Sequence, residues 1–256
     1  MNNSVELLGV YGSDKIHACS AWTSTSRNLT KSKLARIDSL IDMLMSEKHH
    51  TPFEKSALHF LVTTDIATHI HILKHRVGVS VNGESARYKE LGVRKGKGTD
   101  KYYLPHDWHE DERESLRVHV LGCYAKYHAT LERLVAQGHT RKRAKESARL
   151  YLPYATQITA DVMFNFRSFL HFQVLRNSEH AQVEVREVAQ RMWDLLEESH
   201  PEFKATMKAF KDMLERERLK EVAFSVLDEY WLIQPGDDVE DLKRSLRELL
   251  DGERSL

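Results

Sequence analysis

The feature that most constrains the fold is hydrophobic periodicity, which has the helical period over long stretches and the strand period over only short ones. Apolar residues recur at every third or fourth position over residues 30–47 and 107–136, which predicts amphipathic helices. The alternation typical of strands is confined to residues 5–10 and 57–64. A chain that is mostly helix with a few short strands predicts an α+β fold, a mostly helical single domain with a small mixed or antiparallel sheet.

The remaining segments follow the same pattern. Helices are predicted over residues 66–73, 141–150, 158–175 and 180–199. Residues 18–26 are rich in Ser and Thr and predict a loop, and the Gly- and Lys-rich residues 92–105 predict a mobile segment.

Pro201 separates two predicted parts of the chain. Residues 1–200 are predicted to form the main domain, and residues 201–256 a helical extension with a break at Pro235 and Gly236. The extension is expected to pack on the same domain or to form an oligomer contact.

Composition excludes several classes of protein. Lys and Arg number 38, as do Asp and Glu, and this balance argues against a nucleic-acid coat protein. No apolar run reaches the roughly 20 residues that span a bilayer, and no signal-peptide pattern opens the chain. Two cysteines fit a reducing compartment, so a cytoplasmic protein without membrane or nucleic-acid partners is expected. The fifteen His form no HExxH motif, which predicts no metal site.

Residues 74–88, KHRVGVSVNGESARY, suit the binding of an anion. Ser, Asn and Gly are good turn formers, which predicts a loop in the middle of this segment. Arg76 and Arg87 flank it, and Ser85 adds a hydroxyl, so the loop is chemically suited to phosphate. A solvated basic turn is the alternative interpretation.

A second polar group lies on the predicted helix over residues 158–175 and just beyond it. Asn165, Arg167, His171 and Arg176 lie among phenylalanines, which suggests polar groups satisfied by a ligand or by another subunit. Surface or ion-pair roles for Arg167 and Arg176 are the alternative.

Five strings together resemble the flavin-dependent thymidylate synthase family, usually called ThyX. They are HHTPFE, HR...SVNGESARY, YYLP, ARLYLP and NFRSFLHFQVLRNSEHAQVEVRE, in the family's order at near-family spacing. The resemblance implies a ThyX-like fold and a homotetramer with four active sites at subunit junctions. It also implies FAD as cofactor, NADPH as reductant, and methylenetetrahydrofolate as one-carbon donor to dUMP.

The resemblance also assigns roles to individual residues. The implied substrate-binding residues are His71, Arg76, Ser85, Ala86, Arg87, Arg149 and Arg176. The implied cofactor-binding residues are His49, Thr51, Glu54, Lys74, His75, Arg76, Asn82, Asn165, Arg167 and His171. His49, Ser85 and Arg176 are the implied catalytic residues, with a structural role as the alternative for His49. A fixed cation at Arg176 could stabilise negative charge that develops on the pyrimidine.

Four departures from the family pattern concern the same segments. Lys74 replaces an arginine, and the spacing from Arg76 to Ser85 is one residue longer, with the extra residue in 77–79. Gly83 stands where the family usually has Glu. His71 and His171 stand where Gln and Asn are common.

The resemblance implies reductive methylation of dUMP to dTMP. Two alternatives stay open, because the departures fall near the expected base and flavin. One is a divergent flavoenzyme that transfers another one-carbon group, such as hydroxymethyl, to a pyrimidine nucleotide. The other is a catalytically inactive relative that binds a nucleotide or RNA.

Overall fold

The computed structural model describes residues 2–91 and 101–230, with side chains described as far as residue 219. The chain divides into two compact units. One comprises residues 1–28 and 50–203, and the other residues 29–49 and 204–256.

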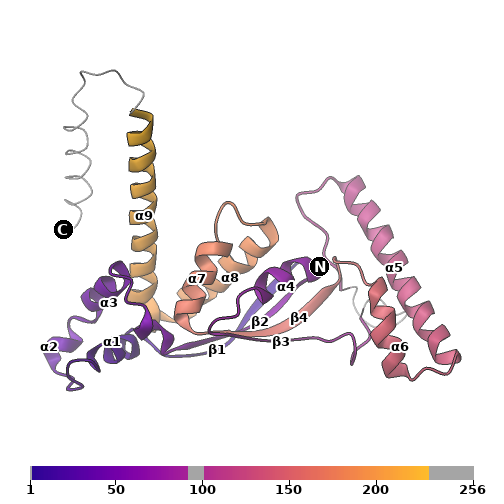
Figure 1. Cartoon of the computed structure of the whole chain (residues 1–256), viewed down its shortest axis with the longest axis horizontal. Coiled ribbons are helices and arrows are strands. Elements are labelled where there is room, and N and C mark those ends of the chain that lie inside the picture. Colours follow the sequence, from indigo (N-terminus) through magenta and orange to yellow (C-terminus); the bar gives the residue numbers. More distant parts are fainter. Residues whose placement is uncertain (1, 92–100, 231–256) are drawn as a thin grey trace. The chain divides into compact units, whose positions relative to one another are not determined.

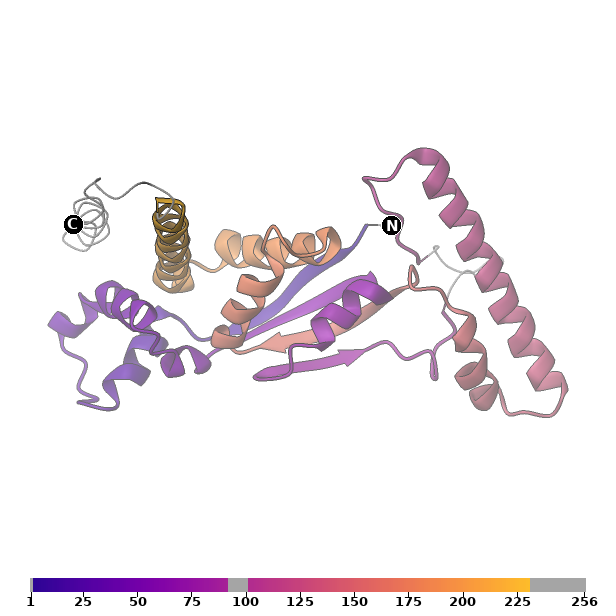
Figure 2. The ribbon, with the colours of Figure 1, turned by 45° about the horizontal axis from the view of Figure 1, so that its top comes forward.

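The first unit is built on a four-stranded antiparallel sheet (Figures 1 and 2). Its strands are β1 (Ser4–Tyr11), β2 (Ala57–Asp65), β3 (Val79–Gly83) and β4 (Gln157–Phe164), in the order β1-β2-β4-β3. The predicted strands at residues 5–10 and 57–64 are confirmed as β1 and β2, and the predicted α+β class is confirmed with them.

Three helices cover one face of this sheet. They are α4 (Ile66–Leu73), α7 (Phe166–Arg176) and α8 (Val183–Ser199), drawn above the strands in Figure 1. Alternate residues of β2 point to them: Leu58, Phe60 and Val62 are buried while their neighbours are partly exposed. Burying these side chains against the helices supplies the main stabilisation of the unit. Aromatic rings fill the layer, and Phe60 stacks on Phe169 with ring centroids 5.8 Å apart.

The predicted helix over residues 158–175 is wrong in its first half, which forms β4. Ile158, Ala160, Val162 and Phe164 alternate with more exposed residues along β4, and all four are buried. This alternation is short and leads directly into α7, and pairing with β2 on one side and β3 on the other makes the segment a strand. Asn165 then caps α7, its Oδ1 accepting from Ser168 N at 2.8 Å.

The predicted loop in the middle of residues 74–88 is also wrong, because Val79–Gly83 forms the edge strand β3. Its polar residues Ser80 and Asn82 pair with Met163 and Asp161 on the face that the three helices leave open. Local propensity favours a turn here, but ladder hydrogen bonds to β4 override it.

Residues 18–26 were predicted as a loop, yet residues 18–22 belong to helix α1 (Asp14–Trp22). Ser13 caps this helix, its Oγ accepting from Ile16 N at 3.2 Å. The buried side of α1 presents His17, Ala18 and Trp22, a pattern too short to be recognised as helical.

Helices α5 (Glu110–Ala136) and α6 (Arg141–Ala148) confirm the predictions for residues 107–136 and 141–150. Val120, Tyr124, Tyr127 and Leu131 form the buried side of α5. Short 3-10 helices follow α6 as η2 (Arg149–Tyr151), precede β2 as η1 (Thr51–Glu54) and follow α8 as η3 (Pro201–Phe203).

The second unit contains α2 (Lys31–Leu34), α3 (Ile37–Ser46) and α9 (Lys204–Tyr230). The prediction of a single helix over residues 30–47 was wrong, because residues 35–36 separate α2 from α3. Nothing in the local sequence explains this break. Lys48 Nζ pairs with Glu217 Oε1 at 2.8 Å within this unit. Pro235 and Gly236, and residues 92–100 of the predicted mobile segment, lie outside the described residues.

Two kinds of feature are absent from the part of the chain that the structure describes. None of its helices is both long and apolar enough to cross a membrane. None of its His, Cys, Asp and Glu side chains form a group of three or more that could hold a metal ion.

Candidate active site

Arg176, in the last turn of α7, contacts two histidines of the α4 region. Its Nε donates to His75 Nε2 at 3.0 Å, and its Nη1 lies 3.4 Å from His71 Nδ1. The third nitrogen, Nη2, has no hydrogen bond within residues 2–91 and 101–219. The guanidinium is thus held on two sides and keeps donors for a ligand.

The two histidines are neutral acceptors for this arginine. Burial, then the charge of Arg176 and then His171 lower the pKa of His75 to about 4. Burial, followed by the charges of Arg176 and Lys74, also lowers the pKa of His71. At neutral pH both rings are therefore uncharged, and Arg176 carries the positive charge of this group.

The start of α7 holds the turn that joins α4 to β3. Ser168 Oγ donates to Val77 O at 2.7 Å, and Asn165 N donates to Gly78 O at 3.0 Å. Gly78 has φ +64, and a Cβ there would lie 2.2 Å from Asn165 Nδ2 and 2.4 Å from Ser168 Oγ. Only glycine fits this close approach, so Gly78 fixes the path of the turn between α4 and β3.

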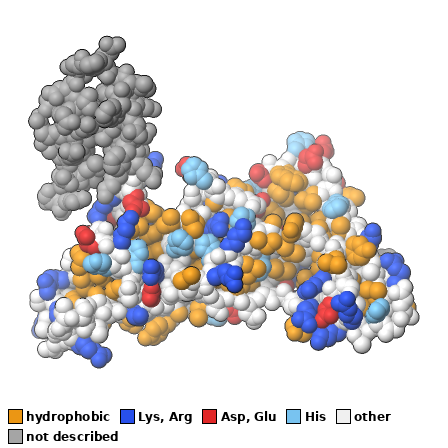
Figure 3. Space-filling view, in the orientation of Figure 1, with side chains coloured by type: hydrophobic (Ala, Val, Ile, Leu, Met, Phe, Trp, Pro, Cys, Tyr) orange, Lys and Arg blue, Asp and Glu red, His pale blue; other side chains and the backbone are white. Residues whose placement is uncertain are grey.

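Most of the predicted cofactor-binding residues belong to the same elements as Arg176, His71 and His75, or contact them. Glu54 of η1 pairs with Arg167 of α7. Lys74, Arg76 and His171 are exposed near the ends of α4 and along α7. Beside them Leu73, Val174 and Leu175 expose 44%, 42% and 45% of their surface, and Figure 3 shows basic and histidine side chains next to hydrophobic ones in this region. A surface that is both cationic and apolar suits a large, flat, anionic ligand.

A second group of predicted residues lies in the turn after β3. Ser85 O accepts from the N–H groups of Tyr88 and Lys89, both at 3.0 Å, and Arg87 N donates to Ser85 Oγ at 3.3 Å. Ala86 lies within this turn. Arg87 Nε and Nη2 both donate to Glu146 Oε1 of α6, at 3.0 and 2.9 Å. This pairing orients the guanidinium and lowers the pKa of Glu146.

The Glu84 side chain connects the turn to β4. Its carboxylate accepts from Thr159 N at 3.2 Å and from Lys89, and Lys101 lies 3.7 Å away. Burial raises the pKa of Glu84, but the hydrogen bonds from Lys89 and Thr159 outweigh it, so the pKa is lowered. Gly83 has space for a Cβ, because a Cβ there would only make contacts of 3.6 Å with Ala160 and His69.

Three predicted residues of the first unit, namely Asn82, Arg149 and Thr51, take part in none of the site contacts described above, and His49 belongs to the other unit. Asn82 pairs with Asp161 on the open face of the sheet, opposite the face that carries Arg176. Arg149 is exposed in η2, and His49 belongs to the second unit, where its N–H donates to Leu44 O at 2.8 Å. Thr51 is exposed at the start of η1.

The structure adds residues that the sequence did not single out, chiefly Glu146, Ser168 and Gly78. Glu146 lies three residues before Arg149 in a basic helix. An acidic residue among Lys and Arg was the sequence feature that could have indicated an ion pair. Ser168, three residues after Asn165, fits a helix-capping pattern that only becomes visible once α7 is known to begin there.

Comparison with known proteins identifies the family. The family model described as "Thymidylate synthase complementing protein" (Thy1) matches residues 6–202. A flavin-dependent thymidylate synthase from Streptomyces coelicolor is 30% identical over 191 residues, which cover 70% of this chain and 76% of that protein. The chain belongs to the flavin-dependent thymidylate synthase family. This membership makes it an enzyme, a flavin-dependent methyltransferase, and confirms the resemblance seen in the sequence.

Other relatives agree with this assignment to the ThyX family. The enzyme of the same name from Thermosipho melanesiensis is 31% identical over 173 residues, covering 63% of this chain and 72% of that protein. The crystal structure of the UMP/dUMP methylase PolB from Streptomyces cacaoi bound with 5-Br UMP gives a TM-score of 0.63 at 27% identity. It covers 83% of this chain and 95% of that chain. The same protein bound with 5-Br dUMP gives a TM-score of 0.63 at 28% identity, covering 82% and 95%.

Proposed function

We propose that this ThyX family member methylates dUMP to dTMP, with FAD as cofactor, NADPH as reductant and methylenetetrahydrofolate as one-carbon donor. The observation that carries the proposal is Arg176, a charged guanidinium held by two neutral histidines with one nitrogen left to donate. A fixed cation of this kind can stabilise negative charge on a pyrimidine ring without reorganising during the reaction.

The phosphate of the nucleotide is assigned to the turn after β3. Ser85 supplies a hydroxyl, and Arg87 has an Nη1 group that is not used by Glu146. Arg149 and Arg76 are exposed guanidinium groups that can add further donors. Guanidinium groups and hydroxyls are the usual partners of phosphate oxygens.

The residues around α4 and α7 fit a flavin. Lys74, Arg76 and Arg167 offer positive charge for the diphosphate, and His75, Asn165 and His171 offer hydrogen-bonding groups. The exposed Leu73 and Val174 offer apolar surface for a ring. The bound flavin would supply hydride. The chain's own residues would hold the nucleotide, orient its base at Arg176 and exclude water from it.

The absorbance spectrum of the purified protein tests this proposal first. A yellow protein whose flavin bands shift on addition of dUMP is expected, followed by dTMP formation when NADPH and methylenetetrahydrofolate are added. A protein that carries no flavin and cannot rescue a thymidine auxotroph would contradict it. Mass spectrometry of the product separates methyl from hydroxymethyl transfer.

UMP is a second candidate substrate. The observation that favours it is the likeness to PolB, a UMP/dUMP methylase, over 95% of that chain. Parallel assays with dUMP, UMP and dCMP measure the preference, and a product from UMP with kcat/KM near that from dUMP would support dual specificity.

We infer that each active site is shared between subunits of a homotetramer. Asn82 and Arg176 lie on opposite faces of one sheet, so a second chain is required for both to reach one ligand. Mixing Asn82→Ala and Arg176→Ala subunits tests this, because a site that takes these two residues from different chains would regain part of the activity that each variant has lost. A monomeric protein in light scattering, or mixtures with no activity, would contradict it.

A further inference from the structure

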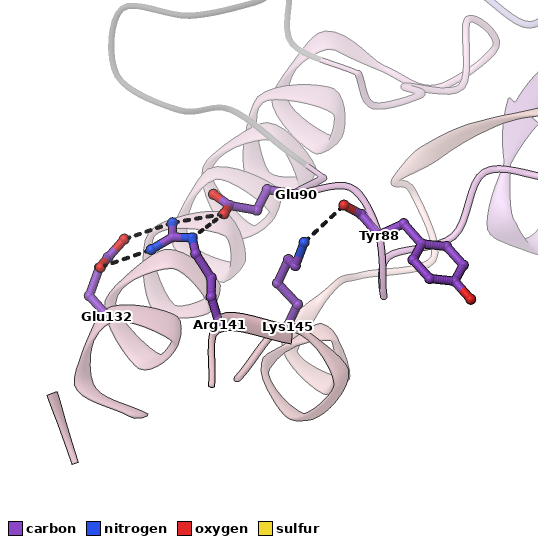
Figure 4. Close-up of polar contacts among 5 residues, drawn as sticks. All are labelled: Tyr88, Glu90, Glu132, Arg141 and Lys145. Carbon is purple, nitrogen blue, oxygen red and sulfur yellow. Dashed lines mark hydrogen bonds and ion pairs between the residues drawn. The ribbon is translucent and has the colours of Figure 1, made fainter. Parts of the chain in front are cut away.

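Helix α6 holds the chain just after the turn that carries Ser85 and Arg87. Lys145 Nζ donates to Tyr88 O at 2.8 Å, and Arg141 Nε donates to Glu90 Oε1 at 2.9 Å (Figure 4). Arg141 and Lys145 are four residues apart and therefore lie on the same side of α6. Successive turns of one helix thus contact the backbone and a side chain of residues 88–90.

Arg141 connects three segments with one guanidinium. Its Nη2 lies 2.7 Å from Glu90 Oε1 and 3.1 Å from Glu132 Oε1 of α5, and Figure 4 shows it between the two carboxylates. The planar fork of arginine can bridge two carboxylates in this way, whereas the single ammonium of lysine cannot reproduce the geometry. The Glu90 side chain is only 19% exposed, so this pair is better shielded than an ordinary surface ion pair.

The turn between these anchors is attached at both ends. At its start, Glu84 N donates to Thr159 O of β4 at 2.8 Å. At its end, Tyr88 and Glu90 are held by α6. Between them, Ser85 O closes the turn by accepting from two N–H groups. Release of the second end would leave the backbone of the turn anchored only at its start, with the Arg87 side chain still paired with Glu146.

We propose that Arg141 is a positioning residue for the nucleotide: by holding Glu90, it fixes the turn in which Ser85 and Arg87 bind the 5′-phosphate. This inference rests on the proposed function, because it takes that turn as the phosphate site. Arg141 itself touches no reacting group. Its effect passes through Glu90 and the backbone of residues 85–90.

Three variants separate this role from general stabilisation of the α5–α6 pair. Arg141→Ala removes both ion pairs, Glu90→Gln weakens the one that reaches the turn, and Glu132→Gln weakens the one that reaches α5. Glu132→Gln is the matched control, because it affects the same guanidinium without touching the turn. Calorimetric titration with dUMP and steady-state kinetics on the flavin-loaded protein are the readouts.

Arg141→Ala and Glu90→Gln are expected to raise the Kd and KM for dUMP by about threefold to tenfold, with kcat at saturating dUMP within about twofold. Glu132→Gln should leave the Kd for dUMP within about twofold of wild type, although its Tm falls. The double variant Arg141→Ala/Glu90→Gln should bind no more weakly than Arg141→Ala, because both changes remove one connection. Amide hydrogen exchange of residues 85–91 should become faster in Arg141→Ala.

The outcomes distinguish failure of the proposed function from failure of the positioning role of Arg141 alone. A wild-type protein that binds neither dUMP nor UMP contradicts the proposed function and this inference with it. A wild type that binds dUMP, together with an Arg141→Ala variant of equal affinity, overturns the positioning role alone. Equal loss of affinity in Glu132→Gln and Glu90→Gln also overturns it, since the effect would then come from the helix pair.

Discussion

The Nε atom of Arg176 donates a hydrogen bond of 3.0 Å to Nε2 of His75. Removing the acceptor in His75→Ala should lower kcat/KM for dUMP by about tenfold to a hundredfold, because the guanidinium loses its orientation. His75→Gln, which keeps an acceptor, should recover part of that loss. Initial rates of dTMP formation measure the effect, with flavin content measured in each variant.

His200→Ala is the control for this series, because His200 pairs with Glu202 beside η3 and contacts none of the proposed site residues. It should keep the wild-type kcat/KM. A His75→Ala variant with wild-type kcat/KM and full flavin content would show that Arg176 needs no support from this ring.

Glu146 pairs with Arg87 through one carboxylate oxygen. Glu146→Gln should weaken dUMP binding by about threefold to tenfold, because a neutral amide orients the guanidinium less firmly than a carboxylate. Calorimetric titration with dUMP measures this, and Glu114→Gln on α5, whose partner is Arg117, is the matched control. Tighter binding in Glu146→Gln would instead mean that Glu146 competes with phosphate for Arg87.

Gly78→Ala should destabilise the protein by about 1–3 kcal/mol, because the left-handed φ and the contacts with Asn165 and Ser168 exclude a Cβ. Gly122→Ala is a contrasting control within α5, where a Cβ would meet nothing within 4 Å. That change should stabilise the protein by about 0.5–1 kcal/mol, since alanine favours helix over glycine. Chemical denaturation measures both, and equal stability of Gly78→Ala and wild type would contradict the close approach.

His17 is buried against Phe53, Phe166 and Phe203, and burial lowers its pKa from 6.5 to about 4. The unfolded chain then binds more protons than the folded one between those values. His17 therefore contributes stability that is present above pH 6.5 and is lost as the pH falls towards 4.

The shift corresponds to a loss of about 3 kcal/mol across that interval. In His17→Gln the amide cannot titrate, so the fall in unfolding free energy between pH 6.5 and 4 should become shallower by about this amount. Urea unfolding at a series of pH values measures the slope. An unchanged slope in the variant would assign the acid sensitivity to other groups.

Elements with a long, clear period were predicted from the sequence, and those made by tertiary pairing were not. The stripe of α5 and the alternation of β2 each extend far enough to exclude the other period. β4 alternates over only eight residues and leads directly into α7, so the sequence favours one continuous helix there. β3 is composed of turn-forming residues and becomes a strand because β4 lies beside it.

The candidate site was predictable in its charged residues but not in the contacts between them. Arg87 and Arg176 are proposed because their chemistry is recognisable in the sequence, and the histidines because of the family resemblance. Their partners Glu146 and Ser168 were missed, because the sequence does not state which helix faces which loop. Asn82 was grouped with residues on the other face of the sheet, since its strand was not recognised.

The left-handed Gly78 also bears on how loop length can vary in relatives. β3 starts at Val79, opposite Phe164, directly after this left-handed glycine. Gaining or losing a residue before Val79 therefore need not shift β3 against β4, so Ser80 and Asn82 keep the face on which they lie. A change of length here would alter the path of the turn, and the pairing of β3 with β4 would stay as it is.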